Sequence, residues 1–169
     1  MRYAAQLPAQ RDIGTLLLTD LGERLPGAVL GLVRDRGEVS LRVGPERLLD
    51  LARFLKEEGP WQFAFLANLS PVDWLSRVPR FEVVYHLRSL LFNYRIGLKV
   101  DVPDGTLALP SLTGLWRAAD WLEREAYDLF GIRFAGHPDL RRIMMPDDWE
   151  GHPYRRDYPL AGRPGGQRA

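Results

Sequence analysis

An uninterrupted alternation of apolar and polar residues over positions 94–102 constrains the fold more than any other feature of the sequence. One set of side chains is apolar, whereas the set between them includes Arg95 and Lys99. This is the pattern of a β-strand with one buried face. Residues 81–88 and 61–69 alternate in a similar way, so we expect a sheet with one apolar face. For residues 61–69 the apolar face is predicted to contain Trp61, Phe63, Phe65, Ala67 and Leu69.

Helical patterns lie before and after these strands and do not alternate with them. Residues 11–25 and 45–58 carry apolar side chains at helical spacing. Between them, residues 28–33 and 38–43 predict a β-hairpin, and the short connection after residue 88 predicts a second one. Helices grouped outside a run of strands indicate the α+β class. We therefore expect a mixed, largely antiparallel sheet that is packed by helices on one side.

A further helix is expected to begin at Asp120 and to end at Gly131. Asp120 is predicted to cap the first N–H groups, while Glu123, three residues on, reaches back to complete a capping box. Glycine is the residue that most often ends a helix in the left-handed conformation. Arg124 and Asp128 are four residues apart, so their side chains can pair on one face of this helix.

Beyond position 130 the apolar periodicity ends and the composition changes. Residues 131–169 are rich in proline, glycine and arginine, so we expect a compact domain over 1–130 followed by an extended irregular tail. Gly-His-Pro occurs at 136–138 and again at 151–153, and an arginine pair follows each copy. Arginine interspersed with aromatic residues is typical of protein–protein anchors, which favours an ordered partner-binding tail; a loose linker is the alternative. The predicted partner-binding residues are His137, Arg141, Arg142, Trp149, His152, Arg155, Arg156, Asp157 and Tyr158.

The composition excludes several kinds of chemistry. The chain has no cysteine, which excludes thiolate nucleophiles, zinc–thiolate sites and cysteine-ligated iron–sulfur clusters. Neither a dinucleotide-binding nor a phosphate-binding glycine motif is present. A net charge of +1 gives no field that would attract nucleic acid. No apolar run reaches the roughly 20 residues that a membrane helix needs. Trp61, Trp116 and Trp121 are expected in the core rather than at a cofactor.

Three groups of polar residues could still carry chemistry. Glu123 and Glu125 could form an acid–base pair, but residues two apart on a helix point in very different directions. His137 and His152 could ligate a metal, although without thiolate partners they are expected to hydrogen-bond neighbouring backbone or carboxylate groups. Loop carboxylates could hold a hard cation, but we expect them to be solvated. These are Asp139, Asp147 and Asp148. We therefore predict no catalytic, cofactor-binding or metal-ligating residue.

Several long motifs resemble one family. Residues 123–132 read Glu-Arg-Glu-Ala-Tyr-Asp-Leu-Phe-Gly-Ile, and residues 136–143 read Gly-His-Pro-Asp-Leu-Arg-Arg-Ile. With residues 80–90, 146–153 and 155–160, they resemble the signature of the C-subunit family (30 kDa type) of NADH-quinone oxidoreductase, respiratory complex I. The resemblance covers about residues 60–160 in order. Tyr154 and Arg156 stand where the family more often has Leu and Lys.

The resemblance implies a non-catalytic α+β subunit of the peripheral arm. It implies docking on the large quinone-site subunit, a location on the cytoplasmic side of the cell membrane, and no cofactor in this chain. Flavin and iron–sulfur clusters are then expected in partner subunits. The equivalent subunit of a complex I-like, energy-converting membrane-bound hydrogenase is the alternative. A free-standing enzyme would need a convergent site that these residues do not form, and the charge balance opposes an RNA-binding module.

Overall fold

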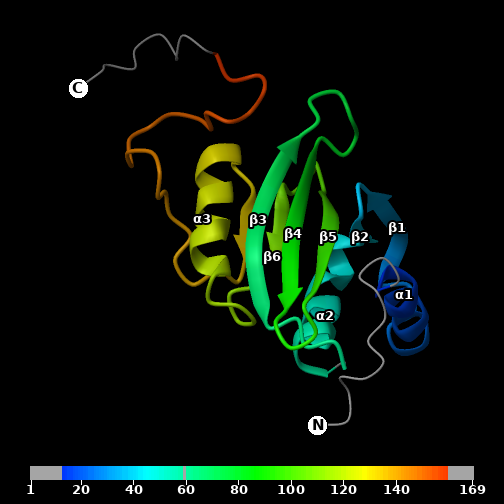
Figure 1. Ribbon diagram of the computed structural model, residues 1–169. Helices are drawn as coiled ribbons and strands as arrows, with labels where there is room; N and C mark the ends of the chain where they lie inside the picture. The colour runs from blue at the N-terminus through cyan, green and yellow to red at the C-terminus, as the bar shows by residue number, and fades with distance from the viewer. Residues whose placement is uncertain (1–12, 59, 160–169) are drawn as a thin grey trace.

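The computed structural model describes residues 13–58 and 60–159. Its centre is a five-stranded sheet with the strand order β1-β2-β5-β4-β3 (Figure 1). All neighbouring strands pair antiparallel except β2 and β5, which pair parallel. The sheet is therefore mixed and largely antiparallel, which confirms the predicted fold class. The strands are β1 (Val29–Asp35), β2 (Glu38–Val43), β3 (Phe65–Asp73), β4 (Phe81–Ser89) and β5 (Tyr94–Val102).

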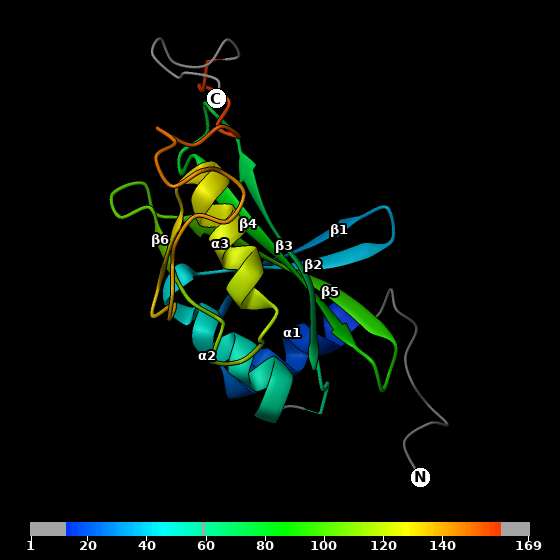
Figure 2. The same cartoon turned by 90° about the vertical axis from the view of Figure 1, so that its left-hand side faces the viewer.

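The α-helices of the described residues lie on one side of this sheet (Figure 2). They are α1 (Ile13–Arg24), α2 (Leu48–Arg53) and α3 (Ala119–Phe130). A 3₁₀ turn (Pro45–Arg47) precedes α2, and a π-helical turn (Phe54–Glu58) follows it. The helix predicted over 45–58 therefore forms, but with an irregular beginning and end.

The core lies between the helices and the alternating apolar row of the sheet. Tyr85, Leu98 and Val100 of the sheet are 0% exposed, as are Leu17 of α1 and Leu51 of α2. Burying a leucine or valine side chain stabilises a fold by about 1.5–3 kcal/mol. The strict alternation that predicted β5 is thus also the main source of apolar contact between the two layers.

Strand β3 differs from its prediction in both position and face. The strand expected over 61–69 begins later, at Phe65, and continues to Asp73. The pairing of β3 with β4 shifts between Leu66 and Asn68. Such a bulge adds a residue and reverses which side chains face the core. Phe65 is consequently 47% exposed whereas Leu66 is buried, so the predicted apolar face is wrong at Phe65 and at the exposed Ala67. Phe63 and Leu69 are buried as predicted.

A small parallel ladder joins the segments on either side of α3. Strands β6 (Ala108–Pro110) and β7 (Arg133–Ala135) were not expected from the sequence, because three residues are too few to show an alternation. Ile132 is 0% and Phe134 is 2% exposed. The expectation that the apolar core pattern ends at position 130 is therefore wrong, since Ile132, just before β7, and Phe134 of β7 both belong to the core.

The tryptophans predicted in the core have different environments. Trp116 is buried, and its indole N–H donates to the carbonyl oxygen of Phe63 at 3.2 Å. Trp61 is half-buried. Trp121 is 64% exposed, so its predicted place in the core is wrong. It stands on the outer surface of α3, where the Arg124 guanidinium lies 5.4 Å from its ring centre.

Candidate functional site: the C-terminal segment on helix α3

The C-terminal segment, defined here as residues 136–159, is bound to residues of helix α3. The helix follows Ala118, and no side chain caps its first N–H groups. The predicted capping box of Asp120 and Glu123 is therefore wrong, because the helix begins at Ala119 and Asp120 already lies in its first turn. At the other end Gly131 adopts a φ of 75° and ends the helix as predicted.

Glu123 points into the domain instead of back along the helix. It is 0% exposed and accepts hydrogen bonds from Leu112 N and Ser111 Oγ, both at 2.7 Å. Burial raises the pKa of this carboxyl to about 7 in spite of the two bonds. Burial and then the Glu123 charge also raise the pKa of Tyr85. Glu125 is exposed, so the two glutamates do not converge on one point.

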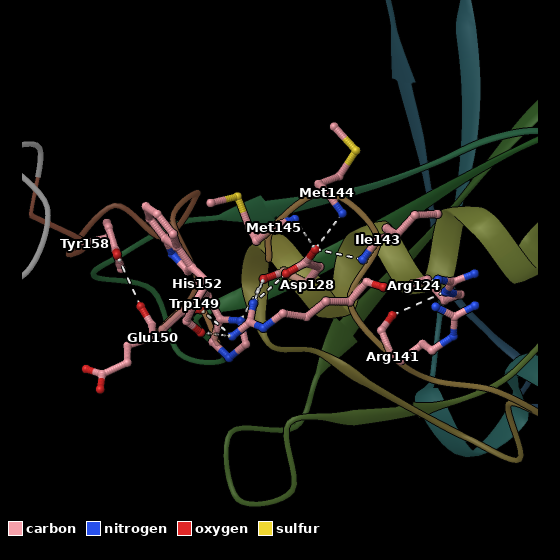
Figure 3. Close-up of polar contacts among 12 residues, drawn as sticks. Arg124, Asp128, Arg141, Ile143, Met144, Met145, Trp149, Glu150, His152 and Tyr158 are labelled. Atoms are coloured by element: carbon pink, nitrogen blue, oxygen red, sulfur yellow. Dashed lines mark hydrogen bonds and ion pairs between the residues drawn. The ribbon is translucent and has the colours of Figure 1, made fainter. Parts of the chain in front are cut away.

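The carboxylate of Asp128 is the centre of the contact between α3 and the C-terminal segment (Figure 3). It is fully buried, and its Oδ2 accepts the backbone N–H groups of Ile143, Met144 and Met145 at 2.9, 2.7 and 2.8 Å. Its Oδ1 accepts a hydrogen bond from Arg142. Burial by itself would raise the pKa of Asp128, but these hydrogen bonds together hold it below its ordinary value.

The predicted ion pair between Arg124 and Asp128 does not form. Arg124 instead donates to the main-chain carbonyls of Arg141 at 3.3 Å and Arg142 at 3.1 Å. Consecutive N–H groups that converge on one carboxylate form an anion-binding nest. That nest, together with Arg142, occupies both oxygens of Asp128. Asp128 therefore binds Arg142 and the backbone of residues 143–145 instead of Arg124, its expected partner on the same helix.

Arg142 closes a loop in the C-terminal segment while it binds α3. Besides Asp128, its guanidinium reaches the carbonyl oxygens of Trp149 at 2.8 Å and Gly151 at 3.0 Å. Five N–H donors in a planar fork make arginine suited to several acceptors at once. The half-buried Arg142 thus fixes the segment's own path as well as its position on the helix.

The last carbonyl groups of α3 lack partners within the helix, as at any helix end. The C-terminal segment supplies them. His152 Nδ1 lies 2.8 Å from the carbonyl oxygen of Asp128, and Arg155 Nε donates to that of Phe130 at 2.6 Å. The backbone N–H of Tyr154 donates to a third carbonyl of this helix end, at 3.1 Å. The C-terminal segment therefore supplies hydrogen-bond donors to carbonyl groups that the helix end leaves without partners.

Gly131 allows this close packing in a second way. A Cβ atom added there would lie 2.4 Å from Arg155 Nη2 and 2.5 Å from His152 Nε2. Burial lowers the pKa of His152, which favours a neutral imidazole whose Nδ1–H can donate to the carbonyl. The prediction that His152 hydrogen-bonds a backbone group is confirmed.

His137 makes the corresponding contact near the beginning of α3. Its Nδ1 accepts the backbone N–H of Asp139 at 3.0 Å, and its Nε2 lies 3.1 Å from the carbonyl oxygen of Asp120. Because Nδ1 accepts, the proton is on Nε2, which donates to that carbonyl. His137 therefore holds the start of the segment, as His152 holds its later part.

A second attachment joins the segment to the β3–β4 loop. Arg80 donates to both oxygens of Asp73, at 2.9 and 2.7 Å, and to both oxygens of Asp157, at 2.9 and 2.7 Å. The backbone N–H of Arg156 also donates to Asp73 at 2.8 Å. The hydrogen bonds from Arg80 lower the pKa of Asp73, and those of both carboxylates raise the pKa of Arg80.

Sequence reasoning did not single out Asp73 or Arg80 as site residues. Arg80 is nevertheless the first residue of the 80–90 motif that supported the family resemblance, so a signal was present. Asp73 carried none, because it lies at the end of a strand whose limits were misplaced. Its role depends on a contact with Arg156 that spans 83 positions in the sequence.

Other predicted site residues point outward or toward the segment itself. Arg141 is exposed and pairs with Asp139 at 2.8 Å, and the side chain of Arg156 is exposed. Tyr158 donates to the carbonyl of Glu150 at 3.2 Å. Trp149 is half-buried, and its indole N–H is buried without a hydrogen-bond partner.

The described residues contain no group of three or more His, Asp or Glu side chains that could hold a metal ion. Within the same part of the chain, no helix is long and apolar enough to cross a membrane. The fold and the site therefore define an α+β protein in which the described α-helices cover one face of the central sheet. Its C-terminal segment is bound along α3.

Comparisons with known proteins identify the family. The sequence model described as "Respiratory-chain NADH dehydrogenase, 30 Kd subunit" matches residues 41–164. The chain therefore belongs to this 30 kDa subunit family of respiratory complex I. It is 54% identical over 144 residues to the C subunit of NADH-quinone oxidoreductase from Roseiflexus sp. (strain RS-1), a match that covers 85% of this chain and 83% of the relative. The same subunit of Geobacter sulfurreducens is 46% identical over 143 residues, or 84% of this chain and 87% of the relative.

Solved structures agree with the fold. One is described as Nqo5, the trypsin-resistant fragment (1-134); it is 36% identical with a TM-score of 0.64 and covers 73% of this chain and 98% of that fragment. A chain of the membrane-bound sulfane sulfur reductase, an archaeal respiratory membrane complex, is 26% identical with a TM-score of 0.71. It covers 88% of this chain and 86% of that one.

Proposed function

We propose that this chain is a non-catalytic subunit in the peripheral arm of a proton-translocating NADH-quinone oxidoreductase. It docks on the large quinone-site subunit through the outer surface of its C-terminal segment, on the cytoplasmic side of the cell membrane. Flavin and iron–sulfur clusters are carried by partner subunits. Electron transfer from NADH to quinone thus depends on this chain for assembly rather than for chemistry.

The division of the segment into an inner and an outer side carries this proposal. Arg142, His152 and Arg155 bind α3, whereas Met144 and Tyr154 are 61% and 62% exposed. The outer side chains of Arg141 and Arg156 are exposed as well. Arginine, methionine and aromatic residues are the types enriched in protein interfaces.

The inner contacts add to the affinity of the outer surface. An extended segment that is fixed before it meets a partner loses less conformational entropy on binding. The partner-binding set predicted from sequence thus has two proposed roles. The inner residues position the segment, and the outer ones contact the partner.

A paired substitution tests the outer surface. The chain with Tyr154→Ala and Arg156→Glu is expected to stay folded by circular dichroism and to lose co-purification with the large quinone-site subunit. Removing one interface anchor costs about 2–4 kcal/mol, which lowers the affinity at least about tenfold. Leu30→Ala is the matched control, because Leu30 is 69% exposed on β1 at the other edge of the sheet. Full assembly and full quinone reductase activity of the double variant would overturn the proposal.

The alternative is the equivalent subunit of a complex I-like membrane-bound hydrogenase. The likeness to a chain of the archaeal sulfane sulfur reductase shows that the fold also occurs in another respiratory membrane complex. The names of the curated relatives favour the main proposal. Neighbouring genes discriminate the two, since flavin- and NADH-binding subunits support complex I and a nickel-binding catalytic subunit supports a hydrogenase.

A further inference from the structure

A groove, called here the β3–α3 groove, lies between the last strand of the sheet and the helix beside it. Strand β3 ends the strand order, and α3 packs next to it (Figure 1). The groove has a volume of about 390 Å³. Residues 68–71 of β3 line one side and α3 lines the other, and Tyr154 of the C-terminal segment also contributes. Within the described residues, no strand pairs with the outer edge of β3.

The buried residues that line the groove are apolar. Leu69 of β3 is 5% exposed, and Ala126 and Leu129 of α3 are 1% and 4% exposed. The small side chain at position 126 takes up little of the space between the strand and the helix. Extended peptides bind an exposed sheet edge by adding a strand to it, and neighbouring pockets then select their side chains. The groove combines such an edge with an apolar lining.

The free edge of β3 has more backbone acceptors than donors. The N–H of Trp74 donates to the carbonyl oxygen of Arg80 at 3.0 Å, so residue 74 pairs toward β4. The register is regular from position 68 to 73, and antiparallel hydrogen bonds alternate along a strand. Leu69 and Pro71 therefore direct their backbone groups away from β4. Because Pro71 has no N–H, the edge presents the carbonyls of both residues but only the N–H of Leu69.

Glu125 is the only charged side chain among the residues that line the groove. It is exposed, and nothing in the described part of the chain pairs with its carboxylate. Helix stability does not explain this glutamate, since no residue three or four positions away on α3 is a cation. Arg124 beside it and Arg155 of the C-terminal segment donate to main-chain carbonyls. The groove therefore presents an unpaired negative charge beside an edge with excess acceptors.

We propose that the β3–α3 groove binds a short extended segment of another subunit that carries an arginine or a lysine. The backbone of this segment pairs with the edge at Leu69 and Pro71, and its cationic side chain binds Glu125. Arginine and lysine side chains have several N–H donors and no acceptor, which matches the excess of acceptors in the groove. Their aliphatic stems can lie along the apolar lining.

The groove is continuous with the surface that the proposed function assigns to docking. Tyr154 is 62% exposed and belongs to both. The inference rests on the proposed function in one respect, since the bound segment belongs to another subunit of the complex. It adds the chemistry of that segment and a second place of contact, on β3 and α3.

Other occupants satisfy the groove less well. A groove does not complement itself, so a second copy bound about a twofold axis would leave both grooves unfilled. Anionic lipid head groups would meet the carboxylate of Glu125. A metal ion would find one carboxylate where several oxygen ligands are needed. The bulge between Leu66 and Asn68 and the missing N–H of Pro71 keep the edge short, which opposes pairing with a long strand.

Site-specific photo-crosslinking in the assembled complex tests the proposal. Trp121 is 64% exposed and stands about one turn before Glu125 on α3. Replacing Trp121 by p-benzoylphenylalanine in the full chain puts an aromatic crosslinker of similar size beside the groove. We expect a crosslinked peptide of another subunit that contains arginine or lysine, identified by mass spectrometry.

Variants at Glu125 measure the contribution of the charge. Glu125→Gln should lower the crosslink yield about tenfold, because the hydrogen bond to a charged group becomes a neutral one. Glu125→Lys should abolish the crosslink, and Glu125→Asp should retain part of it. Glu23→Gln is the matched control, because it removes an exposed carboxylate from α1.

Hydrogen exchange at the amide of Leu69 tests the backbone pairing. This amide should exchange at least about tenfold more slowly in the assembled complex than in the isolated full chain, because the added strand accepts its N–H. The complex with Glu125→Lys should lose that protection. A substitution that acts only through charge elsewhere on the surface would leave the exchange of Leu69 unchanged.

The outcomes that overturn the proposal are distinct. No crosslink at all would contradict it, as would a crosslink to lipid, to a second copy, to residues 160–169 of the same chain or to a peptide without a basic residue. An unchanged yield in Glu125→Gln or unchanged exchange at Leu69 would do the same. Should Glu125→Lys prevent assembly, Glu125→Gln supplies both comparisons. The test of the proposed function changes Tyr154 and Arg156, which stay intact here, so either idea can fail alone.

Discussion

Replacing Asp128 should release the C-terminal segment from α3 while the rest of the domain stays folded. Asp128 is fully buried and is the shared acceptor of Arg142 and of three successive backbone N–H groups. In Asp128→Ala all four donors lose this acceptor. Breaking a buried ion pair by removing one partner costs about 3–5 kcal/mol.

The size of the free-energy loss depends on which of the four donors can hydrogen-bond to water after the substitution. Ile143 and Met145 are half-buried and Met144 is exposed, so their N–H groups can be partly hydrated after the change. Arg142 also keeps its bonds to the carbonyls of Trp149 and Gly151. We therefore expect about 3 kcal/mol, the lower end of the range. Asp128→Asn keeps an acceptor oxygen but loses the charge, and should cost about 1–2 kcal/mol.

Trypsin measures this local opening because arginines line the segment. When opening is fast, the cleavage rate follows the population of the open form. A loss of about 3 kcal/mol should accelerate cleavage by about 100-fold, and Asp128→Asn by about tenfold. Asp148→Ala is the control, an exposed carboxylate on the same segment. Equal cleavage of Asp128→Ala and Asp148→Ala would refute the reasoning. An equal loss of global stability would show that segment and domain unfold together.

Other perturbations test separate parts of the structure. The folded pKa of Glu123, about 7, exceeds its ordinary 4.5, so this group's contribution to stability is present below pH 4.5 and lost as pH rises through 7. Chemical denaturation should show Glu123→Gln removing about 3 kcal/mol of that pH dependence, and parallel pH profiles for both proteins would contradict this. Arg80→Met should cost about 3–5 kcal/mol by leaving buried Asp73 unpaired, whereas Asp157→Asn, at a 54% exposed side chain, should cost at most about 1 kcal/mol; equal melting temperatures would refute the distinction. The isolated chain should show no visible absorption and no NADH oxidation, and a stoichiometric flavin or cluster would overturn that expectation.

The sequence predicts those parts of the fold in which local patterns and tertiary packing agree. The strand over 94–102 forms at its predicted limits because its alternation is uninterrupted and one face is buried. The face predicted for the strand over 61–69 is wrong at Phe65 because a bulge between Leu66 and Asn68 reverses the alternation. No periodic rule includes an extra residue of this kind.

The candidate site shows a different limit of sequence reasoning. Local spacing rules pair Arg124 with Asp128, but neither residue makes that contact. Both bind a segment that follows the helix, and the groups they bind there include backbone carbonyls and N–H groups. Backbone groups are present at every residue and leave no mark in the sequence. The side chains of the segment were recognisable, whereas their partners on α3 were not.

The contacts with α3 show that the two arginines of each pair have different roles. Arg141 and Arg142 are neighbours, yet one side chain is exposed and the other binds Asp128. Arg155 donates to the helix end, whereas the side chain of Arg156 is exposed. Each pair thus supplies one arginine to the helix and one to the surface. Two copies of such a pair therefore attach the segment at two places and leave a charged side chain outward beside each attachment.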